Sequence, residues 1–237
     1  MKYKLEFLFF GDDYMYKKVQ RDLISEQVYE YIKNRIINNE LRPNEKIEVV
    51  QVAEDLGVSR TPVASALNRL RNDGYVTILP QSGTFVRDHS SSELYIIFKC
   101  RAGLEKAIVE TYGETLDRNE LLRIRSAFVT IANDSEDAGT VQEKLFAVDL
   151  QFHAMLIASC AEVIRSSIIS IADLTKRSRL LYFKLARDRE NNMIRINRNI
   201  QMHCNIIDMI LAGQYEIAGQ MVYDDIIFTY DSIKNFV

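Results

Sequence analysis

The chain has 237 residues and a net charge of -3, which is long enough for two domains of ordinary size. This charge argues against non-specific coating of nucleic acid, so DNA binding would need a local basic patch. Cys100, Cys160 and Cys204 show no Cys-x-x-Cys spacing and are expected to be buried free thiols. The apolar run 1–10 is too short to span a membrane and contains Glu6, so we expect a soluble, cytoplasmic protein without a membrane partner.

Residues 1–16 are predicted to form an N-terminal extension. Leu5, Phe7 and Phe9 alternate with their neighbours within 4–10, a spacing that favours a strand. The aromatic residues there favour packing against the rest of the protein or a partner subunit over disorder. The next segment, 22–38, carries an apolar stripe at helical spacing and is predicted to be an amphipathic helix.

A helix-turn-helix is predicted from residues 53–70, with its second helix running to about 73–74. Gly57 stands where a helix can end on a residue with positive φ. Ser59 follows at the position of an N-cap, and Pro62 falls inside the first turn of the next helix, where its missing N–H costs nothing. The second helix of such a pair fits the major groove of DNA. From 56 to 72 the segment contains three arginines and no acid, which suits a groove lined by phosphates.

Two short segments rich in β-branched and aromatic residues, 75–79 and 84–87, surround the turn 80–83 and predict a β-hairpin. Three helices and a hairpin form a winged helix, which we assign to residues 17–88. The polar segment 89–92 is the predicted linker.

The remainder, 93–237, is predicted to be an all-α bundle. No proline occurs after Gln81, and apolar residues recur in steps of three or four. We expect six helices with breaks near Gly113, Gly139 and Gly213, at about 92–113, 117–132, 139–160, 162–187, 192–212 and 214–232. The predicted fold is mostly α: an N-terminal winged helix-turn-helix and a C-terminal helical bundle.

Several blocks of the first domain resemble the winged helix of GntR-type transcriptional regulators. They are Val58-Ser59-Arg60-Thr61-Pro62-Val63, Ala66-Leu67, Arg69-Leu70, Asp73-Gly74-Tyr75-Val76 and Gly83-Thr84-Phe85-Val86, together with the upstream turn 41–47.

This resemblance implies roles for individual residues in DNA binding. Arg60, Thr61 and Arg69 match positions that touch phosphates and guanine edges, and Ser82 and Gly83 match the wing tip near the minor groove. A bidentate arginine discriminates guanine by roughly 1–3 kcal/mol. The alternative is that these arginines are only solvated. The family usually has Arg-Glu where this chain has Ala64-Ser65, a loss of one cation that predicts lower affinity or a different operator.

The bundle resembles the FCD class of effector domain, and its six helices after a short linker resemble the VanR-like branch. Arg101, the segment 104–105, the motif Asp149-Leu-Gln-Phe-His153, His203 and the segment 212–213 carry the likeness. It implies a homodimer on operator DNA, a small carboxylate effector and a divalent metal. Arg101 matches a position that faces the effector; the alternative is an ion pair with an acid of the bundle.

A metal site is predicted at Asp149, His153, His203 and Asp225. Asp149 and His153 are spaced i, i+4 on one helix face, although such a pair is often a surface ion pair. The family's fourth ligand, a histidine twelve residues after Gly213, is replaced here by Asp225. Asp224 leaves the register open by one residue, and Asp225 as a solvated residue is the alternative. Two oxygens and two nitrogens suit Mn²⁺, Ni²⁺ or Mg²⁺ beside Zn²⁺. His89, in the linker, is expected to be solvated.

The predicted function is a regulator, acting as a repressor, that responds to an organic acid bound at the metal-containing pocket. One alternative is a regulator without a ligand, whose pocket has degenerated. A second is a metal-dependent hydrolase with a DNA-targeting module, which the absence of a phosphate loop, a nucleophile elbow or a His-Glu-x-x-His run disfavours. We therefore predict that the protein is not an enzyme.

Overall fold

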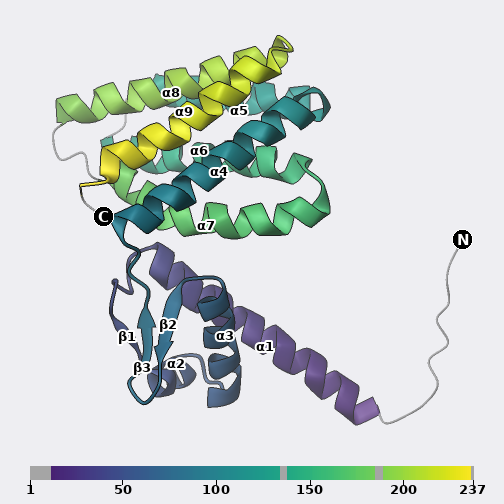
Figure 1. Cartoon of the computed structure of the whole chain (residues 1–237), viewed down its shortest axis with the longest axis vertical. Coiled ribbons are helices and arrows are strands. Elements are labelled where there is room, and N and C mark those ends of the chain that lie inside the picture. The colour runs from purple at the N-terminus through teal and green to yellow at the C-terminus, as the bar shows by residue number, and fades with distance from the viewer. Residues whose placement is uncertain (1–11, 134–137, 185–188, 236–237) are drawn as a thin grey trace, which may run out of the picture. The chain divides into compact units, whose positions relative to one another are not determined.

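The computed structural model describes residues 12–133, 138–184 and 189–235. Contacts between Cα atoms divide the chain into two compact units, Met1–Asp88 and His89–Val237 (Figure 1). The strand suggested for 4–10 lies outside the described residues. None of the helices in the described residues has the length and hydrophobicity of a transmembrane segment.

The first unit combines three helices with a small antiparallel sheet. The helices are α1 (Asp12–Ile37), α2 (Val49–Asp55) and α3 (Arg60–Asn72), and the strands are β1 (Lys46–Ile47), β2 (Val76–Leu79) and β3 (Gly83–Val86). The strand order is β1-β3-β2. The predicted hairpin is confirmed, with Val76 opposite Val86. β1 was missed, because two residues are too few to show an alternation.

Helix α1 begins ten residues before the predicted helix at 22–38 and includes residues 12–16, which we had assigned to the extension. The segment 12–21 contains no proline or glycine. Each further residue of a formed helix adds one backbone hydrogen bond, so a helix can continue beyond its buried stripe. That stripe, Val28, Ile32 and Ile36, is buried as predicted.

The turn between α2 and α3 has the predicted glycine and, at the N-cap position of α3, the predicted serine. Gly57 has φ +63°, and the N–H groups of Gly57 and Val58 bond back to the carbonyls of Glu54 and Ala53, the pattern of a Schellman motif. Ser59 has the extended backbone of an N-cap, but its hydroxyl makes no capping hydrogen bond. The turn is therefore fixed by Gly57 rather than by Ser59.

The second unit contains six α-helices in its described part, as predicted. They are α4 (Ser91–Tyr112), α5 (Arg118–Ala132), α6 (Ala138–Ser159), α7 (Glu162–Lys184), α8 (Arg189–Leu211) and α9 (Tyr215–Ile233), with a 3-10 turn η1 (Gly113–Thr115) after α4. Gly213 ends α8 with φ +74°, whereas Gly139 lies inside the start of α6 rather than at a break.

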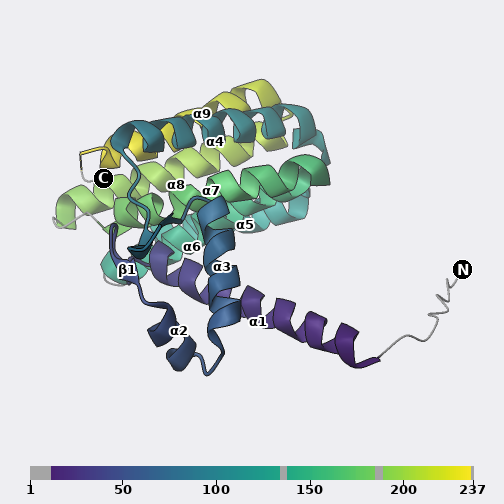
Figure 2. The same cartoon turned by 60° about the horizontal axis from the view of Figure 1, so that its bottom comes forward.

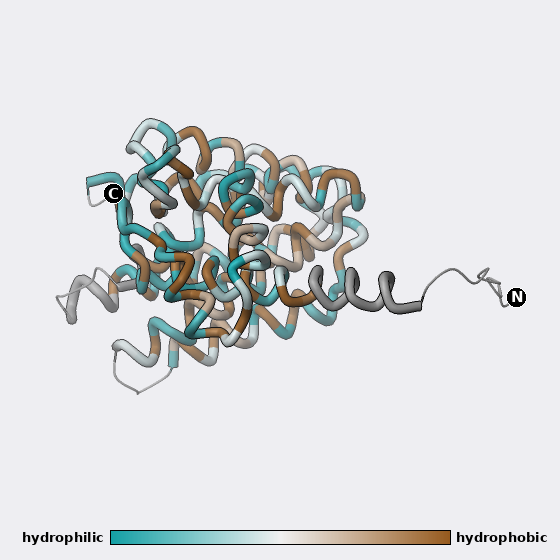
Figure 3. The backbone as a smooth tube through the Cα atoms, turned by 90° about the horizontal axis from the view of Figure 1, so that it is seen from below, coloured by the Kyte–Doolittle hydropathy of each residue, from teal (hydrophilic) through white to brown (hydrophobic). Residues whose placement is uncertain are grey.

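The core of the second unit is formed by the inward faces of these helices. Helices α4 and α9 run side by side (Figure 2), and hydrophobic and hydrophilic stretches alternate along the helices (Figure 3). Phe98, Phe128 and Phe152 are fully buried at the centre. Cys160 and Cys204 are buried free thiols as expected, but Cys100 is exposed, so the expectation of burial was wrong for Cys100.

Replacing Gly57 by alanine should lower the free energy of unfolding by about 1 kcal/mol, because a Cβ disfavours positive φ. The space around Gly57 is open, so no clash contributes. Gly103→Ala is the matched control: Gly103 is helical and also has open space around it. It should raise the free energy by about 0.5–1 kcal/mol. Denaturant unfolding followed by circular dichroism measures both, and equal effects would contradict this account of the turn.

Candidate functional site

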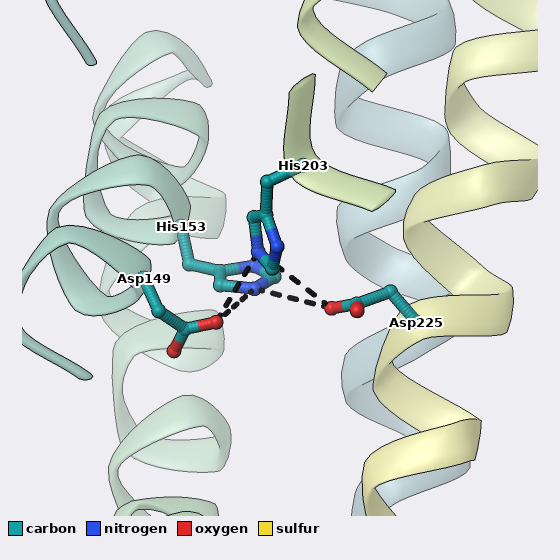
Figure 4. A group of neighbouring side chains, drawn as sticks. All are labelled: Asp149, His153, His203 and Asp225. Atoms are coloured by element: carbon teal, nitrogen blue, oxygen red, sulfur yellow. Dashed lines mark ion pairs between the residues drawn. The ribbon is translucent and has the colours of Figure 1, made fainter. Parts of the chain in front are cut away.

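Four buried side chains from three helices converge inside the second unit (Figure 4). Asp149 and His153 project from α6, His203 from α8 and Asp225 from α9, and one ligand atom of each lies within 4.8 Å of the others. Asp149 Oδ1 is 3.2 Å from His203 Nε2 and 3.7 Å from His153 Nε2. Asp225 Oδ2 is 3.8 Å and 3.7 Å from the same two nitrogens. Asp224 is exposed, so the register favours Asp225.

Hydrogen bonds turn the Nε2 atom of both histidines toward the two carboxylates. Nδ1 of His203 donates to the carbonyl of Asn199 at 2.9 Å, and Nδ1 of His153 donates to Glu105 Oε2 at 2.5 Å. Such partners commonly orient metal-binding histidines. His203 Nε2 is buried and makes no hydrogen bond, which is uncommon for a buried polar atom. Two nitrogens and two oxygens facing one point form a donor set that fits a divalent cation.

Two arginines neutralise the acids around this cluster. Arg179 of α7 pairs with Oδ2 of Asp149. Arg101 of α4 pairs with Glu105 at 2.6 Å and donates from Nη1 to Thr175 Oγ1 at 3.0 Å. Arg101 thus makes the ion pair with an acid of the bundle that was the alternative to effector binding, and its Nη2 is buried without a hydrogen-bond partner.

The buried charges shift each other's pKa. Burial raises the pKa of Glu105, but Arg101 and His153 outweigh it and lower the pKa to about 2. Burial also raises the pKa of Asp149, but Arg179 and the two histidines outweigh this effect and hold the pKa well below the usual range. For His203, burial lowers the pKa, whereas Asp225 and Asp149 raise it, to about 9. Without a metal, His203 therefore carries a proton at neutral pH.

A cavity of about 180 Å³ opens beside this cluster, between α6 and α7. Arg101, Arg179 and His153 form one part of its wall. Two positive side chains and one possible metal ligand therefore lie next to a space that is large enough for a small molecule. The remaining wall comes from α6 and α7.

The residues assigned to DNA binding lie on two parts of the first unit. Arg60 and Thr61 are exposed at the start of α3, and Ser82 is exposed in the β2–β3 turn. Gly83 has φ +117°, and a Cβ there would lie 2.8 Å from the Cε atom of Lys46. The positive φ favours glycine at this point of the wing, whereas the end of the Lys46 side chain could move away from an added Cβ.

Arg69 has partners within the first unit that the sequence did not indicate. Its Nη1 lies 2.5 Å from Glu26 Oε2 of α1, and its guanidinium stacks on the Tyr29 ring at 4.5 Å. The arginine-rich face of α3 is thus partly neutralised by α1, whereas Arg60 stands at the other end of α3.

Sequence reasoning gave no role to Glu105, Arg179 or Asn199. The i, i+4 spacing of Arg101 and Glu105 on one helix was a usable signal for their ion pair. Arg179 and Asp149 are thirty residues apart on different helices, and nothing in the local pattern pairs them. His89 lies outside the cluster, as expected.

Residues 24–86 match the bacterial regulatory proteins of the gntR family, and residues 96–226 match the FCD domain. The second match alone covers more than half of the chain. The protein belongs to the GntR family and carries an FCD domain. It is a DNA-binding transcriptional regulator, not an enzyme, and the predicted fold class is confirmed.

Related proteins are named transcriptional regulators, and a solved structure shares the fold. The Nta operon transcriptional regulator of Aminobacter aminovorans is 28% identical over 60% of this chain and 67% of its own length. The HTH-type transcriptional repressor GlaR of Escherichia coli K12 is 28% identical over 56% of this chain, and the chain spans only 61% of that relative. The structure of E. coli McbR/YncC shares the fold, with a TM-score of 0.70 at 20% identity over 90% of this chain and 97% of that one.

Uptake of a divalent metal by the cluster should release about one proton near neutral pH. The ion would displace the proton that His203 retains because its pKa is raised to about 9. Below that pH the apparent association constant should fall by up to about tenfold per pH unit. Calorimetry in buffers of different ionisation enthalpy counts the protons. A count of zero would show that His203 is neutral before the ion binds.

Proposed function

We propose that this GntR regulator is a homodimeric repressor whose DNA affinity responds to a small carboxylate effector. The effector would bind in the cavity between α6 and α7, next to a divalent metal held by Asp149, His153, His203 and Asp225. The observation that carries this proposal is the convergence of four buried ligand atoms, with the Nδ1 atom of both histidines already occupied.

The donor set favours a metal that accepts both nitrogen and oxygen ligands. Two imidazoles and two carboxylates suit Zn²⁺, Ni²⁺ or Mn²⁺. Since Arg179 already pairs with Asp149 and Arg101 with Glu105, a divalent ion that replaces the His203 proton would leave one net positive charge in this network. When bound, the ion would add positive charge beside the cavity that Arg101 and Arg179 also line. A carboxylate effector meets these charges with charge-assisted hydrogen bonds.

Effector binding can change DNA affinity only if the effector prefers one arrangement of the protein. The coupling free energy in such systems is typically about 1–3 kcal/mol. One recognition helix per chain reads few bases, which favours a C2 dimer on a palindromic operator. Repression is supported by GlaR, which is itself named a repressor.

One observation favours a second candidate, a regulator in which the cluster is only a structural ion-pair network. With His203 protonated, the cations of Arg101, Arg179 and His203 face the carboxylates of Glu105, Asp149 and Asp225. These charges balance without a metal. The raised pKa of His203 is consistent with that state, and the two candidates differ in whether a metal replaces the proton.

Metal analysis of the purified protein separates these candidates. Wild type should bind about one equivalent of divalent metal after dialysis, and His203→Gln should lose at least tenfold in affinity, because it removes one of four ligands. His89→Gln is the matched control, since His89 lies outside the cluster, and it should bind as wild type does. Equal metal content in all three proteins would favour the structural network.

Titration with operator DNA tests which arginines of α3 contact the DNA. Arg60→Ala should weaken specific binding by roughly 1–3 kcal/mol and relax the preference at one position per half-site. Arg69→Ala should weaken binding less, since Glu26 and Tyr29 already engage the Arg69 side chain. Gel shifts with matched and mutated operators measure both. An unchanged affinity for Arg60→Ala would remove this residue from the DNA interface.

A further inference from the structure

The cavity between α6 and α7 has a mostly apolar wall, with charged side chains among its lining residues. We propose that its effector is a monocarboxylate with a short apolar tail, rather than a hydroxylated acid or a dicarboxylate. This inference rests on the proposed function, because it assumes that the cavity binds an acid. It goes further by specifying that the part of the ligand away from the acid group is apolar.

The charged side chains of the cavity wall determine where the acid group of a ligand would bind. Arg101 lines the cavity and is 1% exposed, and its Nη2 has no hydrogen-bond partner. Arg179 and His153 line the same cavity. A buried N–H group without a partner carries a free-energy cost that an incoming acceptor removes. A carboxylate beside Arg101 would thus find a donor that the protein leaves unsatisfied.

The rest of the wall offers few partners for a hydroxyl group. Besides Arg165, Asp173 and Lys176, it consists of aliphatic side chains, which are Leu150, Ala154, Ile157 and Ala158 of α6 and Ile169 and Ala172 of α7. Each ligand hydroxyl placed against such side chains would lose its hydrogen bonds to water without replacement, which is costly. Methylene groups in the same place gain free energy by leaving water.

The shape of this apolar wall depends on two alanines one helical turn apart. Ala154 and Ala158 are spaced i, i+4 on α6, and both are exposed. Across from them on α7, Ile169 is 44% exposed. A ligand tail in the cavity would cover this apolar surface. Larger side chains on α6 would fill the space instead.

The charged residues that also line the cavity have ion-pair partners, and of the Arg165 guanidinium only Nε is buried without a hydrogen bond. Lys176 Nζ lies 2.5 Å from Asp173 Oδ1. Arg165 Nη1 lies 2.9 Å from Glu162 Oε2, and its Nη2 donates to the Cys160 carbonyl. These charges are balanced within α7 and its start. They do not call for a second anionic group on the ligand, which favours a monocarboxylate over a dicarboxylate.

The volume limits the length of the tail. A cavity of about 180 Å³ has room for roughly six water-sized groups at about 30 Å³ each. A carboxylate group with a tail of three or four further carbons occupies that space, and a longer tail would extend through the open side. Affinity should therefore rise from acetate to about pentanoate and level off beyond hexanoate.

Isothermal titration of the full-length, Zn²⁺-loaded protein with acetate, butyrate, hexanoate, gluconate and glutarate tests the proposal. Each methylene up to about pentanoate should tighten binding about fourfold, and gluconate and glutarate should bind more weakly than butyrate. Gluconate or glutarate binding as tightly as hexanoate would overturn the apolar tail but keep the proposed function. A metal-loaded protein that binds none of the acids would overturn both.

A variant that fills the tail site makes the test specific. Ala158→Leu should weaken hexanoate binding at least tenfold and change acetate binding less than twofold, because only the tail reaches this wall. Ala107→Leu is the matched control: Ala107 is also an exposed helical alanine, on α4, and does not line the cavity. It should bind every acid as wild type does. Unchanged hexanoate affinity in Ala158→Leu would contradict the proposal.

Discussion

The helical unit is organised around ionisable side chains that have to be paired because they are buried. Five helices contribute to this network: Arg101 and Glu105 from α4, Asp149 and His153 from α6, Arg179 from α7, His203 from α8 and Asp225 from α9. Removing one partner of a buried ion pair typically costs about 3–5 kcal/mol, because the other charge stays buried and unpaired. The network therefore restricts how these helices can pack against one another.

The same network makes the centre of the unit responsive to small charged ligands. A proton on His203 balances these charges, whereas a divalent metal in its place would leave one net positive charge. The cavity lies against this network through Arg101, His153 and Arg179, so an anion in the cavity would alter the same charge balance. The winged helix has no comparable buried network among its described residues; it is held by the stripe of α1 packed on α3.

Local patterns in the sequence were sufficient for most of the fold. The proline-free second half and its apolar spacing predicted six helices, and Gly57 marked the turn before α3. The pattern could not show β1, which has two residues, or the early start of α1, since helix propagation does not need a buried stripe.

The site was partly predictable for a similar reason. Asp149 and His153 share a helix face, so their spacing placed them together, whereas His203 and Asp225 were assigned through the family resemblance. The salt bridge between Arg179 and Asp149 depends on how α6 and α7 pack, which no short-range spacing reports. The sequence did not show which face of α9 points into the bundle, so it left Asp224 and Asp225 as alternatives. In the structure Asp224 is exposed and accepts a hydrogen bond from Gln220, whereas Asp225 is buried.

Anomalous X-ray diffraction from crystals of the metal-loaded protein would show whether the four converging side chains hold a metal ion. We expect one strong anomalous peak bonded to the Nε2 atoms of His153 and His203 and to carboxylate oxygens of Asp149 and Asp225. A map without a peak at this point, in crystals of protein supplied with Zn²⁺, Ni²⁺ and Mn²⁺ in turn, would show that the cluster is an ion-pair network and would contradict the proposed metal site.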